Sequence, residues 1–458
     1  MSESVKSGTP ATRSLADVFA LQSQQRWTTA RSSAAERKDK LQALRAAVLA
    51  HADDAADALY EDLRKPRERP LMREVARVVS YVDDALAHLD EWMQPEVLPD
   101  RSTGVESLVR YEAKGVVSLF GPWNFPFQLT LAPLVPILAA GNTALVKPNE
   151  MTPATSALIA RILRSTFDDS EVAVFEGGID VANELLDLPV DHIFFTGSPA
   201  VGRIVMAAAA KHLVPVTLEL GGKCPAIVDS TTDVARAASQ VARGKHHNSG
   251  QVCLAPDHVW VHDDVREEFV THYLEWVRGH LYDGDQLDES KCSRIVNQRN
   301  LDRLQGYVTD AVERGAEAHS LGGTPSDGMF MAPVALVGAP LDSEVMQEEI
   351  FGPVLPIIPF TDRAEVVRQL RNSPKPLAMY LFTQDDELAE DLIASSSSGG
   401  VTVNGWATHF EDVRLPFGGV GQSGMGRYQG KAGFAELSNH RAVVRQAEVS
   451  FGGLITDG

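Results

Sequence analysis

One cysteine of the chain lies among small and polar residues, in the stretch GKHHNSGQVCLAPDHV at positions 244–259. This residue, Cys253, is one of three cysteines, and the others are Cys224 and Cys292. An odd number of cysteines without paired spacing is not a disulfide framework. His246 and His247 precede Cys253, but adjacent side chains diverge on a helix or strand, so we predict no metal site. A buried filler and a nucleophilic thiol remain as interpretations.

Two further polar residues lie within or beside strand-like segments. Glu219, in TLELGGKCP, lies inside an apolar run. Buried acids are rare unless they are paired, and desolvation would raise the pKa of this carboxyl and suit it to general-base work. A structural carboxylate bonded to a backbone amide is the alternative. Asn124, in GPWNFPF, lies between prolines at the end of a strand. It is either part of a rigid turn or a fixed amide donor for a developing oxyanion.

Two loops that follow strands are candidates for binding a nucleotide. GSPAVG, from Gly197 to Gly202, follows the strand HIFFT and keeps only the outer glycines of the usual dinucleotide fingerprint. Its amides and a helix N-terminus could hold a phosphate, although an ordinary turn has the same pattern. In VKPNE, Lys147 and Glu150 could reach a ribose, and a solvated charge pair is the alternative.

These residues need elements that bring them together. Apolar spacing of three and four predicts helices from about residue 16 to 92, and we expect them to cover one face of a sheet. Strand-sized runs then alternate with helical ones, which predicts βαβ units and a mostly parallel sheet with strands at 115–119, 143–147, 172–176, 193–196 and 216–218. A second α/β series is expected, with strands at 226–228, 258–261, 355–359, 378–382 and 400–404.

The bulk composition limits the possible partners and compartments. A chain of 458 residues exceeds the size of one core, so two or three domains are expected. The net charge of −20 argues against a nucleic-acid or anionic-membrane surface. The apolar stretch 129–146 is broken by Pro133, Pro136 and Gly141, so it is expected to form a buried helix and a strand instead of a membrane span. The polar N-terminus lacks a secretory signal, and the cytoplasm is the predicted location.

Taken together, the motifs GPWNFP, KPNE, FFTGSPAVG, LELGGK, NSGQVC, EEIFGP and PFGGVGQSG, in this order, resemble the NAD(P)-dependent aldehyde dehydrogenase superfamily over essentially the whole chain. QVCLAPDHV and LPFGGVGQSGMGRYQG resemble its class 3 branch, which includes fatty, aromatic and coniferyl aldehyde dehydrogenases. The resemblance implies an α/β fold with a Rossmann-like cofactor domain, a second catalytic α/β domain and a small β bridging arm. The expected limits are 1–99 and 114–221 for the cofactor domain, 222–422 for the catalytic domain, and 100–113 with 423–458 for the arm and C-terminal segment.

The resemblance also implies roles for individual residues. Cys253 matches the nucleophile, Glu219 the base that activates water, and Asn124 the side-chain oxyanion donor. The implied cofactor contacts are Trp123, Lys147, Glu150, Gly197, Ser198, Gly202, Glu349 and Phe351. We expect NAD to be preferred, with NADP possible, because Glu150 would repel a 2′-phosphate. The resemblance to dimeric members implies a homodimer, while Cys224 and Cys292 are assigned structural places.

The aldehyde itself is less constrained by the sequence. Trp406, Phe410 and Phe125 favour an apolar or aromatic substrate that is medium- or long-chain if aliphatic. Arg243 could meet a carboxylate on the aldehyde, although a solvent-facing arginine is favoured. A CoA-acylating or carboxylated-semialdehyde dehydrogenase is the main alternative, but Glu219 favours water as the acyl acceptor. A non-catalytic binding or structural protein of the same fold is a third hypothesis.

Overall fold

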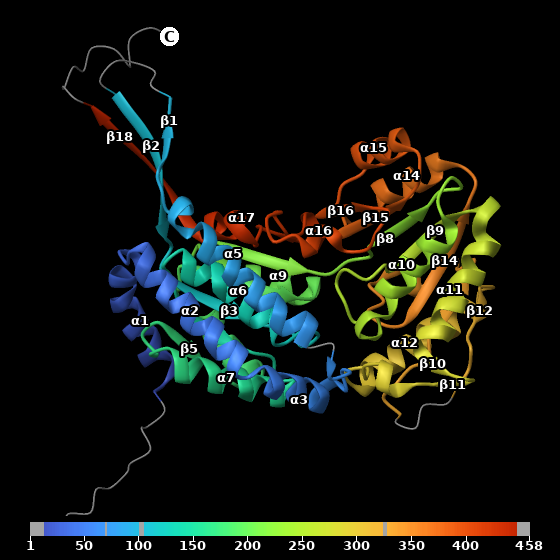
Figure 1. Ribbon diagram of the computed structural model, residues 1–458, viewed down its shortest axis with the longest axis horizontal. Coiled ribbons are helices and arrows are strands. Elements are labelled where there is room, and N and C mark those ends of the chain that lie inside the picture. Colours follow the sequence, from blue (N-terminus) through green and yellow to red (C-terminus); the bar gives the residue numbers. More distant parts are fainter. Residues whose placement is uncertain (1–12, 69–70, 100–104, 324–327, 447–458) are drawn as a thin grey trace, which may run out of the picture.

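The computed structural model of the chain describes residues 13–68, 71–99, 105–323 and 328–446. Two α/β lobes lie side by side, and a narrow β arm projects from the first lobe (Figure 1). Both lobes are built on largely parallel sheets, which confirms the predicted α/β class. Residues 1–12 of the predicted cofactor domain, and 100–104 and 447–458 of the predicted arm and C-terminal segment, lie outside the described residues.

The first lobe is built on a six-stranded sheet in the order β17-β7-β6-β3-β4-β5. The strands are β3 (Val116–Phe120), β4 (Thr143–Lys147), β5 (Val172–Val174), β6 (His192–Gly197), β7 (Val216–Leu220) and β17 (Gly424–Met425). Strands β3 to β7 are parallel, and β17 pairs antiparallel with β7. The strand order reverses at β3, which opens a crevice at the carboxyl ends of β3 and β6.

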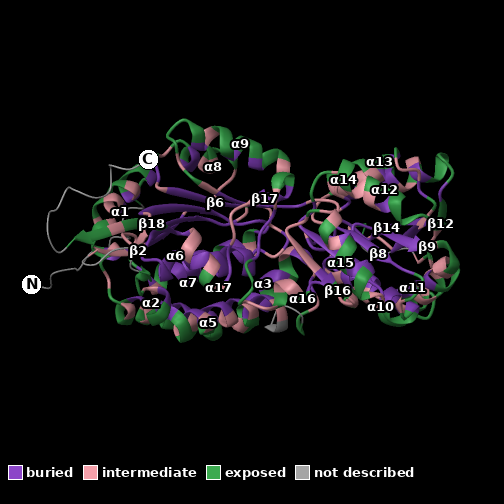
Figure 2. Ribbon diagram, turned by 90° about the horizontal axis from the view of Figure 1, so that it is seen from above, coloured by how far each residue is buried: buried purple, intermediate pink, exposed green. Residues whose placement is uncertain are grey.

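Helices cover both faces of this sheet, whose strands form a buried layer between them (Figure 2). They are α1 (Leu15–Ala30), α2 (Ala34–Ala50), α3 (Ala52–Leu63), the π-helical turn η1 (Leu71–Val75), α5 (Ala76–Trp92), α6 (Gln128–Ala139), α7 (Pro153–Thr166), α8 (Ile179–Leu186), α9 (Pro199–Ala210) and α17 (Gly430–Glu436). Helix α2 begins with a reciprocal capping box between Ser33 and Glu36. The apolar stretch 129–146 forms the fully buried α6 and then β4, as predicted.

The second lobe contains a seven-stranded sheet in the order β12-β13-β14-β9-β8-β15-β16. The strands are β8 (Pro225–Val228), β9 (His258–His262), β12 (Glu317–His319), β13 (Val334–Val337), β14 (Val354–Phe360), β15 (Ala378–Phe382) and β16 (Gly400–Val403). All neighbours are parallel except β12 and β13. The main helices are α10 (Val234–His246), α11 (Arg266–Leu281), α12 (Gln298–Glu313), α14 (Arg363–Asn372) and α15 (Asp386–Ser395), with shorter ones at α13 (Glu344–Gln347) and α16 (Thr408–Glu411).

The arm is a three-stranded antiparallel sheet of β1 (Glu96–Leu98), β2 (Val105–Ala113) and β18 (Ser438–Gln446). Strands β2 and β18 pair along their whole length, so two segments far apart in the sequence form one ribbon (Figure 1). Strand β1 joins the arm, while β17 and α17 join the first lobe. The expected limits at residues 100 and 423 therefore do not coincide with the limits of the sheets.

Several predicted strands coincide with observed ones, including 143–147 and 378–382, because they are continuous apolar runs. Strands β12, β13 and β17 were not predicted. These are strands of two to four residues, too short for an alternation of side chains to be recognised.

Candidate active site

Cys253 follows a tightly coiled segment at the end of α10. Asn248, Ser249 and Gly250 have φ angles of 50°, 52° and 78°, so three successive residues are left-handed. Glycine is required at position 250, because a Cβ there would stand 2.1 Å from the carbonyl oxygen of Gly352. Left-handed backbone at non-glycine residues costs free energy and persists only where surrounding contacts hold it. Here Asn248 Nδ2 donates to the carbonyl of Gln251 at 3.2 Å, and the Ser249 hydroxyl donates to that of Ser293 at 2.7 Å.

The thiol of Cys253 is half-buried, whereas Cys224 and Cys292 are buried. Burial raises the pKa of Cys253 above its ordinary value, and this is the largest cause. The negative charges of Glu349 and Glu219 raise this pKa further. The backbone amides of Cys253 and Leu254 point towards the sulfur and favour its ionised form.

Asn124 lies directly beside residues 248–253, which we call the nucleophile loop because they carry the predicted nucleophile Cys253. Its side-chain Nδ2 donates to the carbonyl of Gln251 at 3.1 Å, two residues before Cys253. Its own backbone carbonyl accepts hydrogen bonds from Lys65 Nζ at 2.7 Å and from Asn248 Nδ2 at 3.1 Å. The structure thus brings Asn124 and Cys253 together although 128 positions separate them in the sequence.

Glu219 lies near the carboxyl end of β7 and is 4% exposed. Within the described part of the chain, neither carboxylate oxygen has a hydrogen-bond partner. The alternative of a structural carboxylate bonded to a backbone amide is therefore wrong. Burial raises the pKa of Glu219 well above its usual range; the charge of Arg427 opposes this rise and that of Glu436 adds to it. Arg427 donates to the carbonyls of Gly419 and Gly426, both at 2.6 Å, which fixes this counter-charge.

Four of the predicted cofactor residues lie at or just after the ends of β4 and β6, the two strands that flank β3 in the first sheet. Lys147 ends β4 and pairs with Glu150 at 2.7 Å. Although partial burial opposes ionisation, the hydrogen bond from Lys147 lowers the pKa of Glu150. Gly197 ends β6, and Ser198 caps α9 by accepting from the amide of Val201 at 3.3 Å.

Gly202 and the remaining predicted contacts pack against neighbours in both lobes. Gly202 packs closely against Leu220 in β7. The rings of Trp123 and Phe351 meet edge to face, with centroids 5.3 Å apart. The carboxylate of Glu349 packs against Gly221, which has no side chain. A Cβ at position 221 would lie 2.1 Å from Oε2 of Glu349. Burial, with the charge of Asp257, raises the pKa of Glu349 to about 8.

Two polar groups in the site were not predicted from the sequence. Lys65 and Glu74 come from the helical region that we expected only to cover the sheet, and that expectation was too narrow. Asp257 accepts from the amide of Ile350 at 2.8 Å and pairs with Lys223, whose Nζ also donates to the carbonyl of Glu348 at 2.9 Å. These contacts join the segments LELGGK, CLAPD and EEIFG. A charged residue in a polar segment carries no sequence signal of burial, so neither group could be singled out.

Aromatic side chains cluster next to Asn124 in the chain, at Phe125. His247 stacks on Phe125 with centroids 5.6 Å apart, and Trp406 lies at 5.6 Å on another side of the imidazole. Trp406 is fixed because its Nε1 donates to the carbonyl of Leu254 at 2.9 Å. Arg243 is exposed, as the solvent-facing interpretation expects. His246 is buried and bonded to the hydroxyl of Tyr273 at 2.7 Å, so it has a structural role.

Cys224, one of the two buried cysteines, also contacts the nucleophile loop. Cys224 Sγ lies 3.3 Å from the carbonyl of Cys253 and accepts from the amide of Ala378 at 3.3 Å. Among the described residues, no group of three or more His, Cys, Asp or Glu could hold a metal ion. No helix in the described ranges is long and apolar enough to cross a bilayer.

The model of the aldehyde dehydrogenase family matches residues 4–443, and this chain belongs to that family. It is an NAD(P)-dependent enzyme that oxidises an aldehyde to the carboxylic acid. The aldehyde dehydrogenase AldX of Bacillus subtilis (strain 168) is 43% identical over 432 residues, covering 94% of this chain and 97% of the relative.

Other relatives and one solved structure agree with this assignment. The coniferyl aldehyde dehydrogenase of Pseudomonas sp. is 38% identical, with 90% of this chain and 87% of the relative covered. The dimeric NADP-preferring aldehyde dehydrogenase of Rattus norvegicus is 39% identical, with 89% of each chain covered. Staphylococcus aureus AldH, solved in a substrate-bound state, is 34% identical and superposes with a TM-score of 0.91 over 96% of each chain.

Proposed function

We propose that Cys253, Asn124 and Glu219 carry out the oxidation in two half-reactions. The observation that carries this proposal is the buried Glu219 carboxyl, which has no bonding partner among the described residues and a raised pKa. Burying a carboxyl without a hydrogen-bond partner costs several kcal/mol of folding free energy, and no hydrogen bond in the described part of the chain offsets this cost. A general base for water is the role that uses both its burial and its pKa.

In the first half-reaction, the thiolate of Cys253 adds to the aldehyde carbon and gives a tetrahedral alkoxide. The amide of Asn124 and the backbone amide of Cys253 donate hydrogen bonds to this developing charge. Collapse of the alkoxide breaks the C–H bond of the former aldehyde carbon, so a hydride leaves and a thioester remains on Cys253. In the second, a water molecule attacks the thioester while Glu219 takes its proton, and the carboxylic acid leaves. The pKa of Cys253 is raised, so the thiol first gives its proton to solvent water, and the thiolate that forms is the nucleophile.

The described residues fit a dinucleotide cofactor at the switch point of the first sheet. Ser198 and the first turn of α9 present an open helix N-terminus that suits a phosphate, and Lys147 with Glu150 suits a ribose. Trp123, Glu349 and Phe351 would border the nicotinamide end, and Gly197 and Gly202 would allow close approach of the backbone. When bound, the cofactor supplies the acceptor for the hydride.

NAD is the proposed preferred cofactor. The carboxylate of Glu150 would bond a ribose 2′-hydroxyl and repel a 2′-phosphate. We expect a higher kcat/KM with NAD, and Glu150→Ala should raise the NADP-to-NAD ratio of kcat/KM about tenfold. Glu176→Ala, which removes a carboxylate bonded to Arg164 after β5, is the matched control. A wild-type preference for NADP, as the name of the rat relative describes, would contradict this reading of Glu150.

An aromatic aldehyde is the proposed substrate class, because Phe125, His247 and Trp406 form a rigid aromatic wall beside Asn124. One relative is named a coniferyl aldehyde dehydrogenase, which favours the same class. We expect kcat/KM for a cinnamaldehyde to exceed that for acetaldehyde about tenfold or more, measured by the formation of reduced nicotinamide. The free acid should form at the same rate with and without CoA. A CoA requirement, or a preference for a carboxylated semialdehyde, would favour the alternative functions.

We also propose a homodimer and a cytoplasmic location. Exposed apolar side chains on α9 and the arm support a second copy as partner; they include Val97, Val201, Ile204, Met206 and Val444. One relative is named dimeric. A nucleophilic thiol needs a reducing compartment, which favours the cytoplasm. Within each chain, we assign cofactor binding to residues 1–99 and 114–221 except for β1, which pairs with β2 in the arm, catalysis to 222–422, and bridging to the arm.

A further inference from the structure

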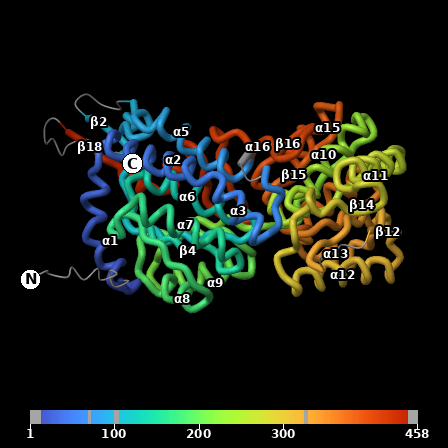
Figure 3. The backbone as a smooth tube through the Cα atoms, turned by 60° about the horizontal axis from the view of Figure 1, so that its bottom comes forward, coloured from blue at the N-terminus to red at the C-terminus, as the bar shows by residue number. Residues whose placement is uncertain are grey.

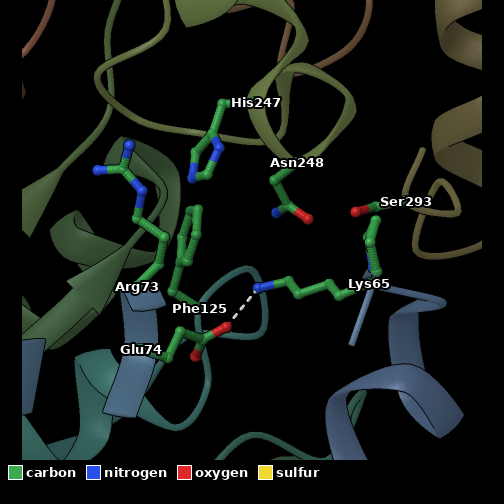
Figure 4. Close-up of a pocket in the computed structure, with 8 residues that line it drawn as sticks. Lys65, Arg73, Glu74, Phe125, His247, Asn248 and Ser293 are labelled. Atoms are coloured by element: carbon green, nitrogen blue, oxygen red, sulfur yellow. Dashed lines mark hydrogen bonds and ion pairs between the residues drawn. The ribbon is translucent and has the colours of Figure 1, made fainter. Parts of the chain in front are cut away.

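A buried ion pair links the segment after α3 to η1. Lys65 Nζ lies 2.6 Å from Glu74 Oε1, and the two side chains are 6% and 1% exposed. Figure 4 shows the ammonium group of Lys65 directed towards Glu74, beside Phe125, at the edge of a small pocket. Burying two charges costs several kcal/mol per ion unless further hydrogen bonds satisfy both groups. The partners of those further bonds therefore indicate what the pair does.

Every further hydrogen bond of the pair goes to the segment that carries Asn124. Lys65 Nζ donates to the carbonyl of Asn124 at 2.7 Å and lies 4.1 Å above the ring of Phe125. Glu74 Oε2 accepts from the amides of Phe127 at 3.1 Å and Gln128 at 3.2 Å. The pair thus holds both ends of residues 124–128, and Figure 3 shows the chain after α3 reaching the junction of the two lobes.

The second lobe holds the same loop from the opposite side. Asn248 Nδ2 donates to the carbonyl of Asn124 at 3.1 Å, so this oxygen accepts one bond from each lobe. The side-chain amide of Asn124 meanwhile donates to the nucleophile loop through Gln251. Two donors therefore hold the backbone of Asn124, and the carbonyl of Gln251 accepts from its side-chain amide.

We propose that Lys65 and Glu74 are positioning residues that hold the amide of Asn124 in the orientation needed to bind the oxyanion. This inference rests on the oxyanion role proposed above for Asn124. Donors must meet the oxyanion at hydrogen-bond distance, and a displacement of about 1 Å can reduce a rate about 100-fold. Among the described residues, the hydrogen bonds of the pair reach neither the predicted cofactor contacts nor the sulfur of Cys253. Its effect is therefore expected at the steps that form an oxyanion, of which addition to the aldehyde is the first.

The test uses the double variant Lys65→Met/Glu74→Gln, which removes both charges and leaves no unpaired buried ion. We expect single-turnover formation of reduced nicotinamide to slow about 10- to 100-fold, with KM for NAD and alkylation of Cys253 by iodoacetamide unchanged. The matched control is Lys40→Met/Glu171→Gln, which removes a partly buried pair 2.6 Å apart in the same lobe and should keep the wild-type rate. Wild-type turnover of the Lys65/Glu74 variant would overturn the proposal.

A double-mutant cycle separates positioning from a general effect on folding. Asn124→Ala alone should slow the same step about 100-fold or more. Adding Lys65→Met/Glu74→Gln to Asn124→Ala should cause less than a twofold further loss, because the pair acts through a side chain that is gone. If the two losses multiply, the pair does not act through Asn124 and the inference is wrong. If Asn124→Ala alone keeps the full rate, the oxyanion role of Asn124 is wrong, and the inference falls with it.

Discussion

Glu219→Gln is expected to complete its first turnover and to stall before the second. Glutamine cannot take a proton from water, so the acyl group stays on Cys253. Addition and hydride release do not need this base, so a burst of reduced nicotinamide close to one per active site should precede a steady state slowed about 100- to 10,000-fold. Rapid-mixing absorbance measures the burst, and mass spectrometry of the quenched protein should find the acyl adduct.

The pH dependence gives this prediction a second readout. Glu219 works only as a carboxylate, and burial raises its pKa. Where deacylation limits turnover, the rate should therefore fall, on acidification, at a higher pH than an ordinary carboxyl would set. Glu436→Gln removes a negative charge that raises the pKa of Glu219, so this limb should move to lower pH with catalysis retained. If Glu219→Gln showed no burst and turned over at the wild-type rate, Glu219 would not be the base for deacylation.

Cys253→Ala should lose aldehyde oxidation altogether, with a fall in kcat of about 10,000-fold or more. Without the thiol there is no tetrahedral alkoxide that can collapse, and no other described cysteine can substitute because Cys224 and Cys292 are buried. Binding of NAD, followed by fluorescence, should remain within about twofold, because the proposed cofactor contacts do not include the sulfur.

Cys292→Ser is the matched control for the number of thiols. It removes a buried cysteine that lies outside the nucleophile loop, next to Ser293, whose backbone carbonyl accepts from Ser249, and it should keep catalytic turnover. Iodoacetamide should inactivate the wild type and Cys292→Ser at the same rate. This rate should rise with pH, because the pKa of Cys253 is raised and the thiolate is the reactive form. Turnover retained by Cys253→Ala would show that another group is the nucleophile.

The sequence predicted much of the fold because parallel strands buried on both faces are continuous apolar runs. Strands β4 and β15 are examples, since every residue in each of them is buried. Cys253, Glu219 and Asn124 could be singled out because each is a polar residue in an unexpected setting. Their proximity depends on β3, β7 and the end of α10 meeting at the junction of the lobes, which no local pattern encodes.

Lys65 shows where such prediction stops. The segment DLRKPRERP is highly charged and is typical of an exposed turn, yet the side chain of Lys65 is almost fully buried. Its burial comes from contacts with Asn124 and Phe125, about 60 positions further along the chain. Arg427 is similar, because a Gly-rich loop carries no sign that one of its arginines will face a buried carboxyl. A single charged residue can be placed only by its tertiary partners.

The order in which the two lobes can mature during synthesis follows from the pairing of β17 with β7 and of β18 with β2. All strands of the second sheet lie before residue 404, so that lobe can close while the chain is still on the ribosome. The described part of the first lobe begins with α1, but the lobe receives its edge strand and α17 only from residues 424–436. Although it is translated first, it is therefore completed last, and a stalled or truncated chain would carry a folded nucleophile lobe beside an unfinished cofactor lobe.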